Sequence, residues 1–438
     1  MKVDKKSLII LVALLTGGNA QGITLQQAVL AASTYDSELA AAANLHDAES
    51  QKRIQGFSGL LPEISLSGNY YKQDQPDASY AAGVKRHSYT LNMTQPIFDL
   101  AKYATWRRAD ASADLADITY MSAQQKLIQD VSNAWFTVIY SRKQLATLQQ
   151  EKRAYEIQLN KVKTALQVGD GTQLDIDEAQ ANFDRAIAEM LSAENELNNA
   201  HINFSRMTGL PAEDIREDNM QCLFRSSNES LQSALERAVQ KNLNIVAARH
   251  QLEEARSDII ATSAAHLPVV SLQASYGGNW SRGENENVWD SIFGTTNKTK
   301  NTYVGVNVSI PIFAGGRQLS QSFESLSRRD QALQLLEDAR RKTIQNTQMS
   351  WLGVKNGLEK INAYKRASES AKKKLASTIF GKEVGLRTLV DQFSAERDLF
   401  KSMQELTEAE NNFLKQKIIL AASTGDLDYS TLDTYVCH

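Results

Sequence analysis

The residues best suited to do chemistry lie in an eight-residue stretch that occurs twice, at residues 168–175 and 384–391. Both copies keep a Val-Gly pair and a Thr-x-x-Asp pattern, which ends at Asp175 in the first copy and at Asp391 in the second. This pattern is typical of a capping box, in which threonine and carboxylate bind backbone amides at the start of a helix. An exposed capping carboxylate can also attract cations. We predict capping for both aspartates and leave the electrostatic role open, favouring it more for Asp391.

No other set of residues predicts catalysis. The six histidines are scattered without a His-x-x-x-His spacing, and no Cys-x-x-Cys pair is present, so we expect no metal site. Gly169-Asp170-Gly171 precedes a helix, but no strand leads into it, which argues against a phosphate-binding loop. A net charge of -3 provides no basic surface for nucleic acid. We therefore predict that the chain is not an enzyme and needs no cofactor.

Long helices must position the two repeated stretches. Residues 99–168 contain neither glycine nor proline, and as one helix they would measure roughly 105 Å. Apolar residues recur in them at steps of three and four, as in coiled coils. A shorter helix is predicted to return over 172–208, and the second copy repeats the arrangement over 317–384 and 386–424. Each stretch is then the tip of a helical hairpin, whose glycine can end the first helix in a left-handed conformation.

The sequence also indicates a tandem duplication. Leu61-Pro62 matches Leu267-Pro268, and Ile64-Ser65-Leu66 matches Val270-Ser271-Leu272. Each repeat is expected to begin with one helix, over about 25–59 and 231–266. The expected organisation is a signal peptide (1–20), a first repeat (21–209), a linker (210–230), a second repeat (231–425) and a C-terminal tail (426–438).

Two stretches in each repeat alternate apolar and small polar residues, which is the signature of a β-strand. A sheet packed on a helical core would alternate in the same way. Strands of about ten residues with one apolar face also fit a transmembrane barrel. Because four strands cannot close such a barrel, several chains would have to share one.

Residues 1–20 resemble a secretory signal, with a lysine-rich start, an apolar core at 8–15 and a small-residue cleavage site. Gln21 follows the expected cleavage site, so no lipid-anchoring cysteine is predicted there. No later stretch has the length and apolarity of a transmembrane helix. For Cys222 and Cys437 we favour isolated thiols over a disulfide, although an exported compartment permits the bond.

Together these features resemble the TolC family of outer-membrane export ducts over residues 23–425. The resemblance rests on the duplicated Leu-Pro strand segments, the Gln-Pro-Ile-Phe-Asp at 95–99, the Ile-Pro-Ile-Phe-Ala-Gly-Gly at 310–316 and the two Val-Gly tips. It implies an α+β membrane protein that works as a homotrimer. Four strands per chain would form a shared 12-strand barrel in outer-membrane lipid, and the long hairpins a periplasmic coiled-coil tunnel. The implied location is the outer membrane of a Gram-negative bacterium.

The resemblance also implies roles at the tips. Asp391 matches a position that lines the periplasmic aperture, and Ser394 stands where a second acidic ring would lie. Asp175 and Arg387 match positions that hold the tunnel closed. Lys382 replaces a tyrosine of that latch, so a lysine–carboxylate pair is a possible substitute. The turns are implied to dock a periplasmic adaptor, and they include Gly169, Gly171, Gly385 and Leu386.

The implied function is a passive exit duct that works with an inner-membrane transporter and a periplasmic adaptor. We favour type I protein secretion with an ABC transporter, because the missing lipid-anchor cysteine and the short tail after Gly425 resemble secretion-type members. A multidrug or small-molecule efflux duct is the first alternative. A periplasmic coiled-coil adaptor is the second, but it would explain neither the duplication nor the paired strands.

Overall fold

A computed structural model describes residues 22–74, 83–216, 223–224, 229–283, 292 and 297–432. The expected signal peptide and both cysteines lie outside these residues. The chain divides into two compact units, which we describe separately. The tip unit comprises residues 1–41, 122–242 and 342–438, and the sheet unit comprises residues 42–121 and 243–341.

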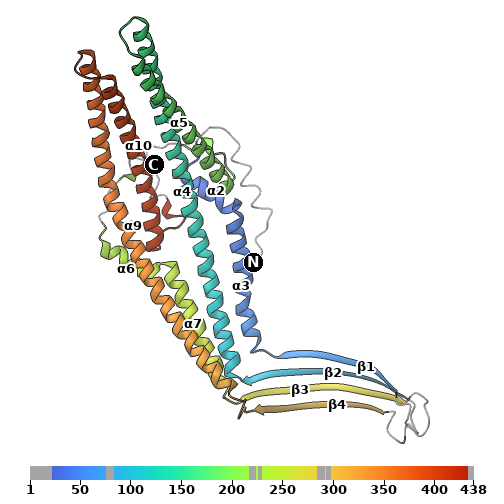
Figure 1. The fold of residues 1–438 in the computed structure, drawn as a ribbon. Helices are drawn as coiled ribbons and strands as arrows, with labels where there is room; N and C mark the ends of the chain where they lie inside the picture. The colour runs from blue at the N-terminus through green and yellow to red at the C-terminus, as the bar shows by residue number, and fades with distance from the viewer. Residues whose placement is uncertain are drawn as a thin grey trace. The chain divides into compact units, whose positions relative to one another are not determined.

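The sheet unit contains one antiparallel sheet with the strand order β1-β2-β3-β4 (Figure 1). The strands are β1 (Glu63–Asp74), β2 (Gly83–Phe98), β3 (Val269–Gly283) and β4 (Asn297–Ser309). The two strands of each repeat are neighbours, and β2 pairs with β3 to join the repeats. The structure thus confirms two strands per repeat.

One face of this sheet is apolar. In the register of the four strands, Ile64 lies opposite Met93, Met93 opposite Ala274, and Ala274 opposite Val304. Val304 is 68% exposed although it belongs to this apolar row. Alternate positions therefore gather apolar side chains on a single surface, as the period of two predicts. An exposed apolar surface of this kind marks contact with another protein or with lipid.

The first predicted helix of each repeat is in fact two helices. The structure has α2 (Leu25–Tyr35) and α3 (Ser37–Ser58) in the first repeat, and α6 (Leu231–Lys241) and α7 (Leu243–Ala264) in the second. The expectation of unbroken helices over 25–59 and 231–266 was therefore wrong.

Short polar side chains cause both breaks. Asp36 and Asn242 adopt extended backbone angles between the helices. The Asp36 carboxylate accepts a hydrogen bond from the Leu39 amide (2.8 Å), which caps α3. The Asn242 amide donates to the Ser423 carbonyl (2.9 Å), which ties its break to the end of α10 (Leu389–Thr424). Asp36 and Asn242 occupy equivalent places in the two repeats, in agreement with duplication.

Two helical hairpins dominate the tip unit. The first joins α4 (Leu100–Gln167, 68 residues) to α5 (Gln173–Thr208, 36 residues). The second joins α9 (Arg317–Glu383, 67 residues) to α10, which has 36 residues. The bounds agree with the predictions, except that α10 begins at Leu389 rather than Leu386. Within the described residues, no helix combines the length and apolarity needed to cross a membrane.

Alanines form the seam of the return helices. In α5 every seventh residue from Ala179 to Ala200 is a buried alanine, and Ala395, Ser402 and Ala409 continue this spacing in α10. A small residue at every seventh position lets neighbouring helices approach closely along a coiled-coil seam. The predicted coiled-coil packing is therefore confirmed.

The described part of the linker between the repeats contacts both hairpins of the tip unit. The Arg142 guanidinium on α4 donates to the carbonyls of Ala212 (3.2 Å) and Ile215 (3.0 Å). Lys417 on α10 donates to the carbonyl of Leu223 (3.1 Å). These contacts give the described part of the linker a structural role that its sequence did not predict.

Candidate functional site: the paired hairpin tips

Left-handed glycines follow α4 and α9, the first helices of the two hairpins. Gly169 has φ 82° and Gly385 has φ 77°, a region that side-chain-bearing residues seldom adopt. The chain then folds back, because the amide of Asp170 donates to the carbonyl of Ala165 (2.9 Å) and that of Leu386 to Gly381 (2.7 Å). These are the helix-ending turns that the sequence predicts at both tips.

Gly171 is needed for a different reason. Its φ is not left-handed, but a Cβ at this position would lie 2.9 Å from the backbone nitrogen of Leu166. The first turn therefore packs so closely against the end of α4 that only glycine fits.

A complete capping box begins α5 and α10, the second helices of the two hairpins. At the first tip the Thr172 amide and hydroxyl donate to the Asp175 carboxylate (3.0 and 2.7 Å), and the Asp175 amide donates to the Thr172 hydroxyl (3.1 Å). At the second tip the same bonds join Thr388 and Asp391 (3.0, 3.0 and 3.1 Å). The predicted capping is thus confirmed for both aspartates.

The hydrogen bonds from Thr388 hold the pKa of Asp391 below its ordinary value, first through the backbone amide and then through the hydroxyl. The charge of Arg387 adds to this effect. Arg387 itself is exposed and makes no ion pair within 4 Å with any residue that the structure describes. Ser394 lies half-buried, three residues after Asp391. The contacts with Thr388 therefore favour the charged form of the Asp391 carboxylate.

Lys382 is half-buried in the tip unit. Its Nζ donates to the Gln392 side-chain oxygen (3.0 Å). Burial lowers the pKa of Lys382, while the negative charges of Glu396 and Asp175 counter that effect. Among the described residues Lys382 forms no direct salt bridge with a carboxylate. The side-chain amide of Gln392 instead connects the lysine to a buried acid.

That buried acid, Glu396, was missed by the sequence analysis. Its Oε1 accepts hydrogen bonds from Gln392 (2.9 Å) and from Gln158 of α4 (3.3 Å). A signal for it exists, because Leu389, Phe393, Glu396 and Phe400 follow one another at steps of four, three and four. This spacing places a glutamate in the apolar seam of a helix.

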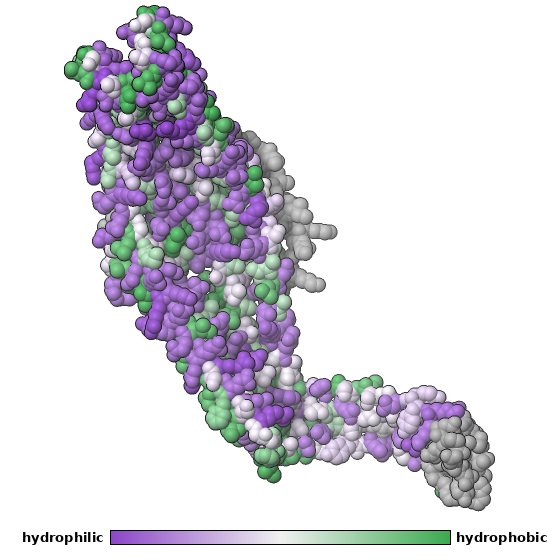
Figure 2. Space-filling model, in the orientation of Figure 1, coloured by the Kyte–Doolittle hydropathy of each residue, from purple (hydrophilic) through white to green (hydrophobic). Residues whose placement is uncertain are grey.

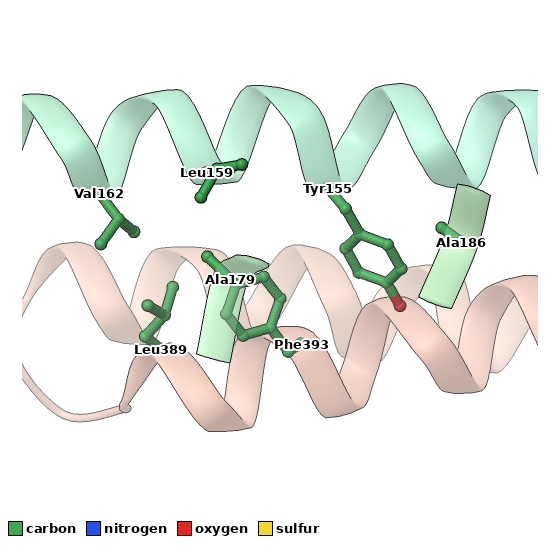
Figure 3. Close-up of a cluster of buried hydrophobic side chains, with 7 residues drawn as sticks. All are labelled: Tyr155, Leu159, Val162, Ala179, Ala186, Leu389 and Phe393. Atoms are coloured by element: carbon green, nitrogen blue, oxygen red, sulfur yellow. The ribbon is translucent and has the colours of Figure 1, made fainter. Parts of the chain in front are cut away.

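An apolar cluster lies beside these polar groups (Figure 3). It joins three helices: α4 contributes Tyr155, Leu159 and Val162, α5 contributes Ala179 and Ala186, and α10 contributes Leu389 and Phe393. The rings of Tyr155 and Phe393 meet edge to face, with centroids 5.9 Å apart. The cluster therefore holds the two hairpins together close to their turns.

The turns themselves present apolar side chains to solvent. Leu386 is 80% exposed, and Val168, Leu174 and Phe380 are also largely exposed. Hydrophobic residues at the tips are visible in Figure 2, where the rest of the visible face of the tip unit is mostly hydrophilic. Apolar side chains at the ends of otherwise polar hairpins are suited to bind another protein.

One protein family covers most of the chain. The model of the family described as "Outer membrane efflux protein" matches residues 32–210 and 234–426. The chain is 30% identical to Outer membrane protein TolC of Escherichia coli (strain K12) over 441 residues, with 98% of this chain and 88% of that protein covered. It is 26% identical to Alkaline protease secretion protein AprF of Pseudomonas aeruginosa, with 91% and 83% covered.

The fold matches a solved structure over nearly the whole length of both chains. The crystal structure of the outer membrane protein VceC from Vibrio cholerae superimposes with a TM-score of 0.78 and 16% sequence identity, covering 92% of this chain and 96% of that one. At this identity the likeness establishes the fold alone.

Proposed function

The chain belongs to the outer membrane efflux protein family, and from this premise we propose that it is the exit duct of a type I protein secretion system. The family consists of outer-membrane channel proteins, which are not enzymes. The protein is therefore an efflux or secretion channel in the outer membrane of a Gram-negative bacterium, with a large periplasmic portion. Its membership confirms the predicted family, fold class and location, and it decides against the periplasmic adaptor.

The similarity to AprF supports secretion over efflux. AprF is named for secretion of alkaline protease, and its likeness to this chain spans 91% of the residues with no restriction to one repeat. A multidrug or small-molecule efflux duct is the competing function, and the description of the family itself favours it.

We propose further that three chains assemble. The family forms homotrimeric channels that work with periplasmic adaptors and inner-membrane pumps. The four-stranded sheet ends at β1 and β4, and free strand edges favour pairing with another chain. Three such sheets would supply the 12-strand barrel. The apolar row that includes Ile64 and Val304 would then face the outer-membrane lipid.

The tips are proposed as the periplasmic end of the duct. Three Asp391 carboxylates around a threefold axis would form a cation-attracting ring, with Ser394 one turn beyond it. Asp175, Arg387 and Lys382 are proposed to hold the aperture closed. The exposed Leu386 and the glycine turns at Gly169, Gly171 and Gly385 are proposed to dock the adaptor of an ABC transporter.

A deletion strain of the bacterium that encodes the protein separates the two functions. We expect the cargo of a type I ABC transporter to disappear from the medium and to return when the gene is restored. Drug susceptibility should stay unchanged in the same strains. Unchanged secretion together with raised drug susceptibility would replace the secretion assignment by efflux.

A further inference from the structure

Two buried glutamates in the tip unit are not used by the capping or aperture roles. Glu151 lies on α4 and Glu396 on α10, and each is only 5% exposed. Removing a carboxylate from water is unfavourable unless protein groups replace its hydration or a proton neutralises it.

Hydrogen bonding compensates them only in part. Both amides that reach Glu396, from Gln158 and Gln392, donate to the same oxygen, Oε1. Its Oε2 has no hydrogen-bond partner among the described residues, and neither does Oε2 of Glu151. Tyr155 provides the side-chain hydrogen bond of Glu151. Each carboxylate thus keeps one buried oxygen on which a proton can sit.

The surrounding charges do not neutralise the pair. The titratable groups that act on one or other glutamate are Tyr155 and Lys161 from α4, Arg185 and Glu189 from α5, and Lys382 from α9. Arg397 of α10 acts on Tyr155. Burial is the largest influence on both glutamates, followed for Glu151 by repulsion from Glu189. These influences raise the pKa of Glu151 to about 7, and they also raise that of Glu396.

The pair lies where the hairpins are held together. Glu396 connects α10 to α4 through Gln158, and Gln392 connects it to Lys382 on α9. Tyr155, the partner of Glu151, packs its ring on Phe393 in the apolar cluster. A negative charge gained here would therefore be gained inside the contact between the hairpins.

We propose that Glu151 and Glu396 form a proton-dependent latch, which holds the α4/α5 and α9/α10 hairpins together when it is protonated and releases them when it is ionised. The latch lies within one chain and does not depend on the secretion assignment. The pH dependence of the latch has a definite direction. A carboxyl whose pKa is raised in the packed state binds a proton more tightly there, so packing weakens as pH rises from its ordinary pKa of 4.5 to about 7. Above that range the effect is constant.

Amide hydrogen exchange of the purified full-length protein tests the latch. Protection of residues 389–400, corrected for the intrinsic pH dependence of exchange, should fall at least about tenfold between pH 5 and pH 8. Glu151→Gln and Glu396→Gln keep the shape of the side chain and remove its charge. Each should flatten this profile and give more protection than the wild type at pH 8, which the loss of a merely structural contact would not do.

Glu194→Gln is the matched control, since Glu194 is an exposed glutamate of α5, and it should keep the wild-type profile. A wild-type profile that is flat from pH 5 to pH 8 would overturn the latch, whether or not the variants fold. So would glutamine variants that retain the wild-type slope. Both results could occur in a protein that secretes normally, so failure of the latch is distinguishable from failure of the secretion assignment.

Discussion

Phe393 is the residue whose truncation should separate the tips most directly. It is 5% exposed and belongs to the cluster that joins α4, α5 and α10. Replacing a buried phenylalanine by alanine removes its transfer free energy and leaves a cavity, which together cost about 3–5 kcal/mol. Because this cluster lies close to the hairpin ends and can partly collapse, we expect the lower value, about 3 kcal/mol.

This loss should appear as local opening rather than global unfolding. Since about 1.4 kcal/mol corresponds to a factor of ten, Phe393→Ala should raise amide exchange of residues 389–400 by a factor of about one hundred. The effect is limited by the free energy of local opening in the wild type. Exchange should be followed by mass spectrometry under conditions in which opening is in equilibrium.

Phe380→Ala is the control, because it makes the same chemical change on α9 at a side chain that is 66% exposed. It should change the free energy of opening by less than about 0.5 kcal/mol. Equal effects of the two substitutions would refute the claim that the apolar cluster holds the hairpins together.

The turns and the capping aspartate give three further predictions. Gly385→Ala should destabilise the second tip by about 1–2 kcal/mol, because a φ of 77° is unfavourable for a residue that has a Cβ. Crowding adds nothing to this cost, since no atom lies within 4 Å of the added Cβ. Gly385→Asn should cost less in the same exchange assay, and equal costs would contradict a backbone cause. Asp391→Ala should raise conductance or weaken block by multivalent cations in planar bilayers, and unchanged conductance and block would remove Asp391 from the lumen. Cation selectivity should be lost as falling pH protonates Asp391, and the hydrogen bonds from Thr388, which lower the pKa of Asp391, should move that loss to lower pH. Thr388→Val should shift the loss of selectivity to higher pH in reversal-potential measurements, and an unshifted midpoint would contradict the role of Thr388.

Local signals explain why much of the fold could be predicted. The absence of glycine and proline from residues 99–168 fixes the extent of α4, and the alternation of apolar and polar residues fixes the strands. The tips were predicted down to their capping boxes, because Thr172 and Thr388 need only the next turn of the chain as a partner. These features depend on contacts between residues close in sequence.

Features that depend on distant partners were not predicted. Asn242 interrupts a helix while its side chain bonds to Ser423, far along the chain. The buried Glu396 accepts a hydrogen bond from Gln158 of the other hairpin. The seam spacing could have placed Glu396 inside, but neither its donor nor its unpartnered oxygen can be read from one sequence.

Single-channel recording of the purified protein in planar bilayers, after detergent extraction and sizing, tests the duct most directly. We predict a stable trimer that forms cation-selective pores. A soluble species of one chain that gives no conductance would contradict the account.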